Sequence, residues 1–179
     1  MVERHFYAHG DTAMNLNALM LIPHDQIDYT SLDADTLRGL ATQNSEPYIA
    51  TSALAELGAR AGHEARAAAV TILSTELWDR HLFAFAITTL CDIDCEEAAR
   101  TMPRLLDVTS DAKVLGAMVE CVLSHPDNFS SDSGQEILGR LATKVARVDP
   151  DEFTDAEERT AFLARYRRRA GTHSDDPHE

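Results

Sequence analysis

The chain has 179 residues, of which 30 are Asp or Glu and 16 are Lys or Arg, so its formal net charge is −14. This acidic excess argues against a nucleic-acid-binding protein, because contacts to phosphate groups require a surplus of basic side chains. Hydrophobic residues make up 44% of the sequence, which excludes a disordered chain and favours one packed domain.

The composition predicts an all-α protein. Alanine and leucine dominate, aromatic residues amount to 6%, and alternating strand patterns are rare. Residues 1–33 are predicted to form an irregular N-terminal segment with one short helix at residues 15–22, which Pro23 would end. The next helix is expected to begin after Asp33, a good N-cap residue, and to end near Asn44.

The middle of the chain repeats with a period of about 33 residues. Leu57, Leu90 and Leu123 follow one another at this spacing, and neighbouring apolar positions do the same. Each unit divides into two helical stretches, predicted at residues 47–60 and 64–77, 79–92 and 95–108, and 111–124 and 133–148, with an insert at 126–132. Because one helical hairpin cannot bury its own apolar face, the period predicts stacked hairpins, an α-solenoid, over residues 34–148. The alternative is a helical bundle without repeats.

A further helix is predicted within residues 149–170. The sequence Thr154-Asp155-Ala156-Glu157 is a capping-box pattern that would begin it. Four arginines at positions 165 and 167–169 would lie at its C-terminal end, where the helix dipole favours positive charge. Residues 171–179 are polar and are expected to be a disordered tail.

The first unit resembles a HEAT-like repeat of the short bacterial type. In residues 47–58, Pro47 opens the helix, Ile49 is the aliphatic residue two positions later, and Leu57-Gly58 closes it, while Glu64-Ala65 resembles the pair that opens the second helix. The match covers about residues 46–148 and weakens along the chain, where Arg80 and Lys113 replace the proline and Cys91 and Ser124 replace the glycine. The resemblance implies an α-solenoid and indicates almost nothing about function, because such repeats serve many partners.

Two clusters contain side chains that can bind metals. Cys91 and Cys95 flank two aspartates, but a structural zinc site needs four ligands, and Cys121 is predicted to stand alone on a buried helix. Three cysteines also do not predict a disulfide framework. His5 and His9 are four residues apart, yet Gly10 indicates a turn there. We therefore expect no metal and no cofactor, and the sequence leaves open whether Cys91/Cys95 or His5/His9 bind an ion.

The remaining motifs argue against an enzyme and against a membrane protein. The sequence contains no glycine-rich phosphate loop and no GxSxG element. No stretch approaches the about 20 apolar residues that span a bilayer, and the N-terminus does not resemble a signal peptide. We expect a cytoplasmic protein with no catalytic residues.

The sequence thus predicts a protein–protein interaction module with a basic protein partner. A small acidic HEAT-like protein is similar to an immunity protein that neutralises a bacterial toxin. The alternatives are an intracellular scaffold or regulatory adaptor, and an enzyme or bilin-lyase-like protein on a HEAT-like scaffold. The contact surface is expected near the ends of the units, where acidic side chains recur and where the single tryptophan lies. Helix capping, solvation or packing would also explain these residues. They are Glu46, Trp78, Asp79, Asp92, Asp94, Glu96, Asp111 and Asp127. The sequence identifies neither the partner nor the oligomeric state.

Overall fold

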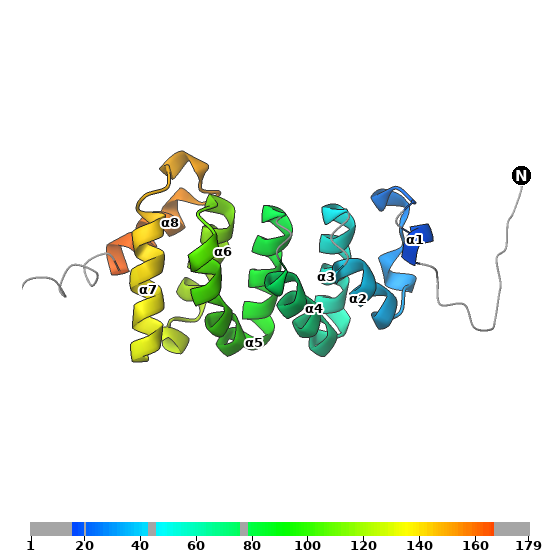
Figure 1. The fold of residues 1–179 in the computed structure, drawn as a ribbon, viewed down its shortest axis with the longest axis horizontal. Coiled ribbons are helices and arrows are strands. Elements are labelled where there is room, and N and C mark those ends of the chain that lie inside the picture. Colours follow the sequence, from blue (N-terminus) through cyan, green and yellow to red (C-terminus); the bar gives the residue numbers. More distant parts are fainter. Residues whose placement is uncertain (1–15, 20, 43–45, 76–78, 167–179) are drawn as a thin grey trace, which may run out of the picture.

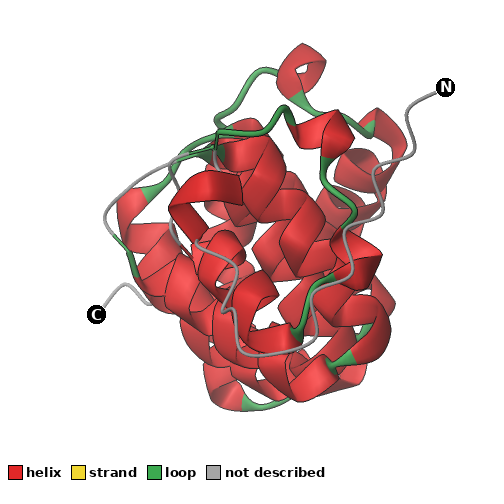
Figure 2. Cartoon of the chain, turned by 90° about the vertical axis from the view of Figure 1, so that its right-hand side faces the viewer, coloured by secondary structure: helices red, strands yellow, loops and turns green. Residues whose placement is uncertain are grey.

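A computed structural model describes residues 16–19, 21–42, 46–75 and 79–166. This part of the chain is all-helical and contains no strand, as the sequence predicts (Figure 2). The helices are α1 (Leu16–Leu19), α2 (Ala34–Thr42), α3 (Pro47–Arg60), α4 (Gly62–Ser74), α5 (Arg80–Val108), α6 (Ala112–Ser124), α7 (Asp132–Val145) and α8 (Ala156–Tyr166). Four single 3-10 turns connect them: η1 (His24–Gln26), η2 (Tyr29–Ser31), η3 (Pro126–Phe129) and η4 (Pro150–Glu152).

Most predicted helices agree with the structure. Helix α3 has the predicted bounds, because Pro47 has the φ angle that a first helical turn requires. Helix α4 begins at Gly62, two residues before the predicted start, and ends at Ser74. Within the predicted helix at 15–22, Leu16–Leu19 form the single turn α1, and residues 21 and 22 are not helical.

Helix α5 covers two predicted helices in one continuous element. Its backbone is interrupted at Asp94, where φ is −151° and ψ is 78°, so α5 consists of a first segment (80–93) and a second segment (95–108). The side chain of Asp94 accepts a hydrogen bond from the backbone N–H of Glu97 at 3.0 Å and caps the second segment. The gap that the sequence predicts between residues 92 and 95 is therefore this kink.

The helices lie in a row along the long axis of the molecule, from α1 and α2 at one end to α7 and α8 at the other (Figure 1). Helix α2 packs on α3 and α4, both of these pack on α5, and α5 packs on α6. Helices α7 and α8 pack on α6 and on each other. The buried core is continuous along this row, and its largest fully buried side chains are Phe83, Phe129 and Phe162.

Ion pairs link alternate elements of the row when the two segments of α5 are counted separately. Arg38 on α2 lies 2.8 Å from Glu64 on α4. Arg66 on α4 lies 2.7 Å from Asp94 on α5, and the second segment of α5 pairs with α7 through Asp107 and Arg140. The row is therefore tied together in chain order by charged side chains as well as by its core.

The start of α8 differs from the prediction by one residue. Asp155, and not Thr154, is the capping residue, because the Asp155 carboxylate accepts a hydrogen bond from the backbone N–H of Glu158 at 2.8 Å. An ionised carboxylate is a stronger acceptor for the first amides of a helix than a hydroxyl is. Of the predicted basic end, Arg165 lies in α8, whereas residues 167–169 and the predicted tail lie outside the described residues.

None of the described helices combines the length and the apolar character that crossing a membrane would require.

Candidate functional site

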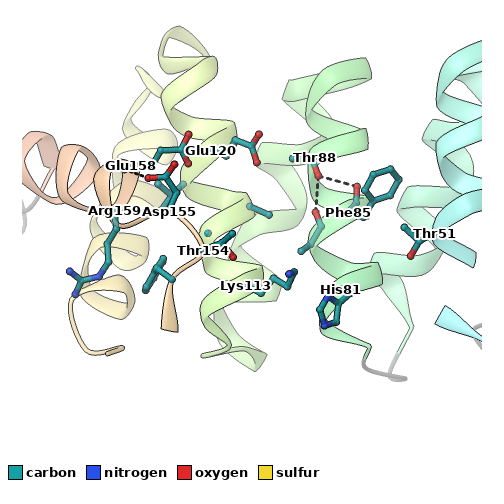
Figure 3. Close-up of a pocket in the computed structure, with 15 residues that line it drawn as sticks. Thr51, His81, Phe85, Thr88, Lys113, Glu120, Thr154, Asp155, Glu158 and Arg159 are labelled. Atoms are coloured by element: carbon teal, nitrogen blue, oxygen red, sulfur yellow. Dashed lines mark hydrogen bonds between the residues drawn. The ribbon is translucent and has the colours of Figure 1, made fainter. Parts of the chain in front are cut away.

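A cavity with a volume of about 520 Å³ lies between α3, α5, α6 and the start of α8 (Figure 3). We call it the α8 groove. Apolar side chains from three of these elements contribute to it, among them Phe85 of α5 and Phe153 just before α8. Its polar and charged lining residues are Thr51, His81, Thr88, Lys113, Glu120, Thr154, Asp155, Glu158 and Arg159.

Three carboxylates gather at one end of the α8 groove. Glu120 projects from α6, and Asp155 and Glu158 project from the start of α8, toward the same space (Figure 3). Burial raises the pKa of Glu158, and the charges of Asp155 and Glu120 raise it further. Within the described part of the chain, none of the three carboxylates has a basic side chain within ion-pair distance.

The basic residues of the α8 groove are held apart from these carboxylates. His81 and Lys113 lie toward the opposite end in Figure 3. The guanidinium of Arg159 lies over the ring of Phe153, 5.4 Å from its centroid, and donates to the backbone oxygens of Val145 and Val148. The groove thus combines apolar walls with an unneutralised acidic end, which suits recognition of a positively charged side chain flanked by apolar ones.

The Glu158→Gln variant is expected to be more stable than the Glu157→Gln variant at pH 7. Both residues lie in the first turn of α8, so both substitutions remove one favourable charge from a helix N-terminus. The pKa of Glu158 is raised, so the stability of the wild type falls as the pH rises through that pKa, and glutamine abolishes this loss.

Thermal unfolding at pH 7 and at pH 3 measures this difference. At pH 3 the carboxyl group of Glu158 is protonated in the wild type, so its charge no longer costs stability and the advantage of Glu158→Gln over Glu157→Gln should shrink. Equal stability of the two variants at both pH values would contradict the raised pKa of Glu158 and with it the burial and repulsion that cause it.

Seven of the eight residues predicted from the sequence are described by the structure, and none of these seven lines the α8 groove. Three of them cap helices. Asp79 accepts from the backbone N–H of Leu82 at 2.8 Å, and Asp111 accepts from that of Lys113 at 2.9 Å. Asp94 caps the second segment of α5, and its pKa is lowered first by the N–H of Glu97 and then by Arg66. The recurrence of aspartates at the ends of units therefore has a structural explanation.

The other predicted residues lie on the surface or outside the described chain. Glu46, Asp92 and Asp127 are exposed. Glu96 is exposed too and pairs with Arg100 one turn away, at 3.4 Å. Trp78 falls outside the described residues, as do His5 and His9. Arg80, which follows Asp79 in the sequence, lies 4.0 Å from Asp111, so an ion pair links the starts of α5 and α6.

Replacing Asp111 by alanine is expected to cost about 0.5–2 kcal/mol of stability, because the first amides of α6 lose their acceptor. Asp79→Ala should cost a similar amount at the start of α5. Asp92 is exposed and makes no described hydrogen bond, so Asp92→Ala should stay within about 0.5 kcal/mol of the wild type. Urea unfolding followed by circular dichroism compares the three variants. A loss for Asp92→Ala equal to that for Asp111→Ala would contradict the capping role.

The cysteines form a second cluster, which overturns one expectation. Cys121 does not stand alone: it forms a disulfide with Cys91, with 5.9 Å between the two Cα atoms. Packing of α6 beside the first segment of α5 brings together residues that are 30 positions apart. Cys95 is buried beside them as a free thiol, and burial is the main cause of its raised pKa. Cys91, Cys95 and His125 place one donor atom each within 4.8 Å of one another.

Comparisons with family models, with curated proteins and with solved structures found no match to this chain.

Proposed function

We propose that this chain is a protein-binding module for a basic protein partner, and that the partner docks on the α8 groove. The observation that carries the proposal is the group formed by Glu120, Asp155 and Glu158 at one end of an apolar groove. Their mutual repulsion contributes to the raised pKa of Glu158 and lowers the stability of the folded chain when no partner is bound. A lysine or arginine of a partner would relieve that cost on binding, so the same carboxylates favour the complex.

The overall charge supports the same class of partner. A net charge of −14 on 179 residues attracts a cationic protein over distances longer than direct contact. Steering of this kind raises association rates by about 10- to 1,000-fold and weakens as salt is added.

The arrangement of the helices supports a short HEAT-like α-solenoid as the scaffold for this surface. The sequence period of about 33 residues, the row of helices and the ion pairs between alternate elements all agree with stacked helical hairpins. Scaffolds of this type use extended surfaces to bind other proteins. The α8 groove lies where such a row meets a helix that is not part of the repeat.

An immunity protein that neutralises a cationic bacterial toxin is the specific function that we favour. Such an inhibitor must bind one basic protein tightly, and an acidic groove with apolar walls can supply both charge complementarity and buried area. A scaffold or regulatory adaptor would use the same groove for a different basic partner.

Affinity capture from lysate of the native host, with the immobilised chain at 50 mM and at 500 mM NaCl, tests the proposal. We expect one basic protein to be retained at low salt, and its purified form to bind at least about tenfold more weakly at high salt. If its gene lies beside that of this chain and its activity is toxic, the function is immunity. Capture of an acidic partner with salt-independent affinity, or of no partner at low salt, would contradict the proposal.

A further inference from the structure

Four side chains with metal-binding atoms converge where α5 and α6 lie side by side. Cys91 and Cys95 are four residues apart on α5, on either side of the kink at Asp94, and Cys121 lies in the last turn of α6, four residues before His125, which directly follows that helix. From Cys95, the Sγ atom lies 3.7 Å from that of Cys91 and 4.0 Å from that of Cys121. Nδ1 of His125 lies 3.4 Å from Sγ of Cys91. We propose that the reduced chain binds one Zn²⁺ through these three sulfur atoms and this nitrogen.

The spacing of the donor atoms agrees with tetrahedral zinc. Bond lengths of about 2.3 Å for Zn–S and about 2.05 Å for Zn–N place sulfur atoms about 3.8 Å apart and a sulfur and a nitrogen about 3.5 Å apart. The distances of 3.7, 4.0 and 3.4 Å fall close to these values. These are three of the six donor–donor distances of such a site. Cys91 and Cys121 form a disulfide in this structure, so their sulfur atoms must separate before both can bind zinc.

The chemistry of the donors also favours zinc. Three cysteines and one histidine, in two pairs that are far apart in the sequence, form a closed ligand set of the structural type. The three cysteines are buried, whereas His125 is half-buried and offers a path for the ion from solvent. Asn128 supports both kinds of ligand, because its side chain hydrogen-bonds Cys95 and its backbone N–H donates to the carbonyl oxygen of His125 at 3.2 Å.

Reduction must precede metal binding. A dithiol reductant transfers two electrons to the Cys91–Cys121 disulfide, which becomes two thiols while the dithiol becomes a disulfide. Zn²⁺ then replaces the protons of the three thiols, which pass to solvent, and His125 binds as the neutral imidazole. The oxidised chain lacks two of the four ligands. Disulfide and metal are therefore alternative links between α5 and α6.

Cobalt(II), a spectroscopic substitute for zinc, provides the test. The full chain is reduced with a phosphine under anaerobic conditions, freed of reductant and titrated with Co²⁺ and then with Zn²⁺. We expect one Co²⁺ per chain, with thiolate-to-cobalt charge-transfer absorption and the visible bands of tetrahedral cobalt, and displacement by an equimolar amount of Zn²⁺. The unreduced chain should show none of these bands.

Two ligand variants and one matched control complete the experiment. Cys95→Ser and His125→Asn should each weaken metal binding by at least about 100-fold, and the half-buried position of His125 makes misfolding of that variant a smaller risk. His63→Asn, at an exposed histidine far along the chain, should bind like the wild type. The proposal is overturned if the reduced chain takes up no cobalt, whether or not it stays helical. It is also overturned if the spectrum lacks thiolate bands, or if Cys95→Ser and His125→Asn bind as tightly as His63→Asn.

Discussion

Replacing Phe129 by alanine is expected to destabilise the chain by about 3–5 kcal/mol, the loss typical of a buried phenylalanine. Phe129 lies in η3, within the segment that the sequence predicts as an insert between helices, yet its side chain is fully buried. Its carbonyl oxygen also accepts a hydrogen bond from the side chain of Gln135 on α7 at 2.8 Å. The insert is therefore part of the core, and its aromatic side chain should contribute as much as one in a long helix.

Urea unfolding followed by circular dichroism measures this loss, with two phenylalanine or tyrosine variants for comparison. Phe83→Ala, at a fully buried position of α5, should cost about as much as Phe129→Ala. Tyr48→Ala, at a side chain that is 73% exposed, should change stability by less than about 0.5 kcal/mol. If Phe129→Ala behaves like Tyr48→Ala, the insert does not belong to the core.

Two glycines of α7 are expected to respond to alanine with opposite signs. A Cβ atom at Gly134 would lie 2.6 Å from the carbonyl carbon and oxygen of Phe129, so the first turn of α7 or the end of η3 would have to move. Gly134→Ala should therefore cost about 1–3 kcal/mol, in the range of overpacked sites. Gly139 has no atom within 4 Å of a Cβ, and Gly139→Ala should stabilise the helix by about 0.5–1 kcal/mol.

The two glycine variants form a matched pair, because the same substitution is made in the same helix. Differential scanning calorimetry should give a lower Tm than that of the wild type for Gly134→Ala and a higher Tm for Gly139→Ala. A stabilising effect at both positions would mean that the chain does not approach itself closely at Phe129. A destabilising effect at both would mean that α7 does not behave as a regular helix around Gly139.

The sequence predicts the helices well because they depend on local signals. Pro47 fixes the start of α3, and Asp79 and Asp111 are strong N-cap residues in the positions where the structure uses them. The sequence is less informative where two adjacent residues could both cap a helix. The choice between Thr154 and Asp155 as the cap of α8 depends on which acceptor reaches the amide of Glu158, and adjacent residue types do not decide this.

The sites were not predicted because each depends on packing between elements. Cys121 is 26 residues from Cys95, and only the contact of α6 with α5 brings the two thiols together. One signal was available: Cys121 and His125 have the same four-residue spacing as Cys91 and Cys95, in the next unit of the period. The sequence contains no such signal for the α8 groove. The residues of α8 lie outside the 33-residue period, and nothing in them indicates that Glu158 faces Glu120.

The functional proposal depends on the carboxylates at the acidic end of the α8 groove. The most direct test measures the affinity of the captured partner for variants of the chain that lack these charges. Isothermal titration calorimetry at 50 mM NaCl compares the wild type with Glu120→Gln/Glu158→Gln and with the control Glu157→Gln, whose side chain is exposed and does not line the groove. We expect the double variant to bind at least about tenfold more weakly, a loss of about 1.4 kcal/mol or more, and the control to bind like the wild type. Equal affinity of the double variant and the control would contradict docking on this groove.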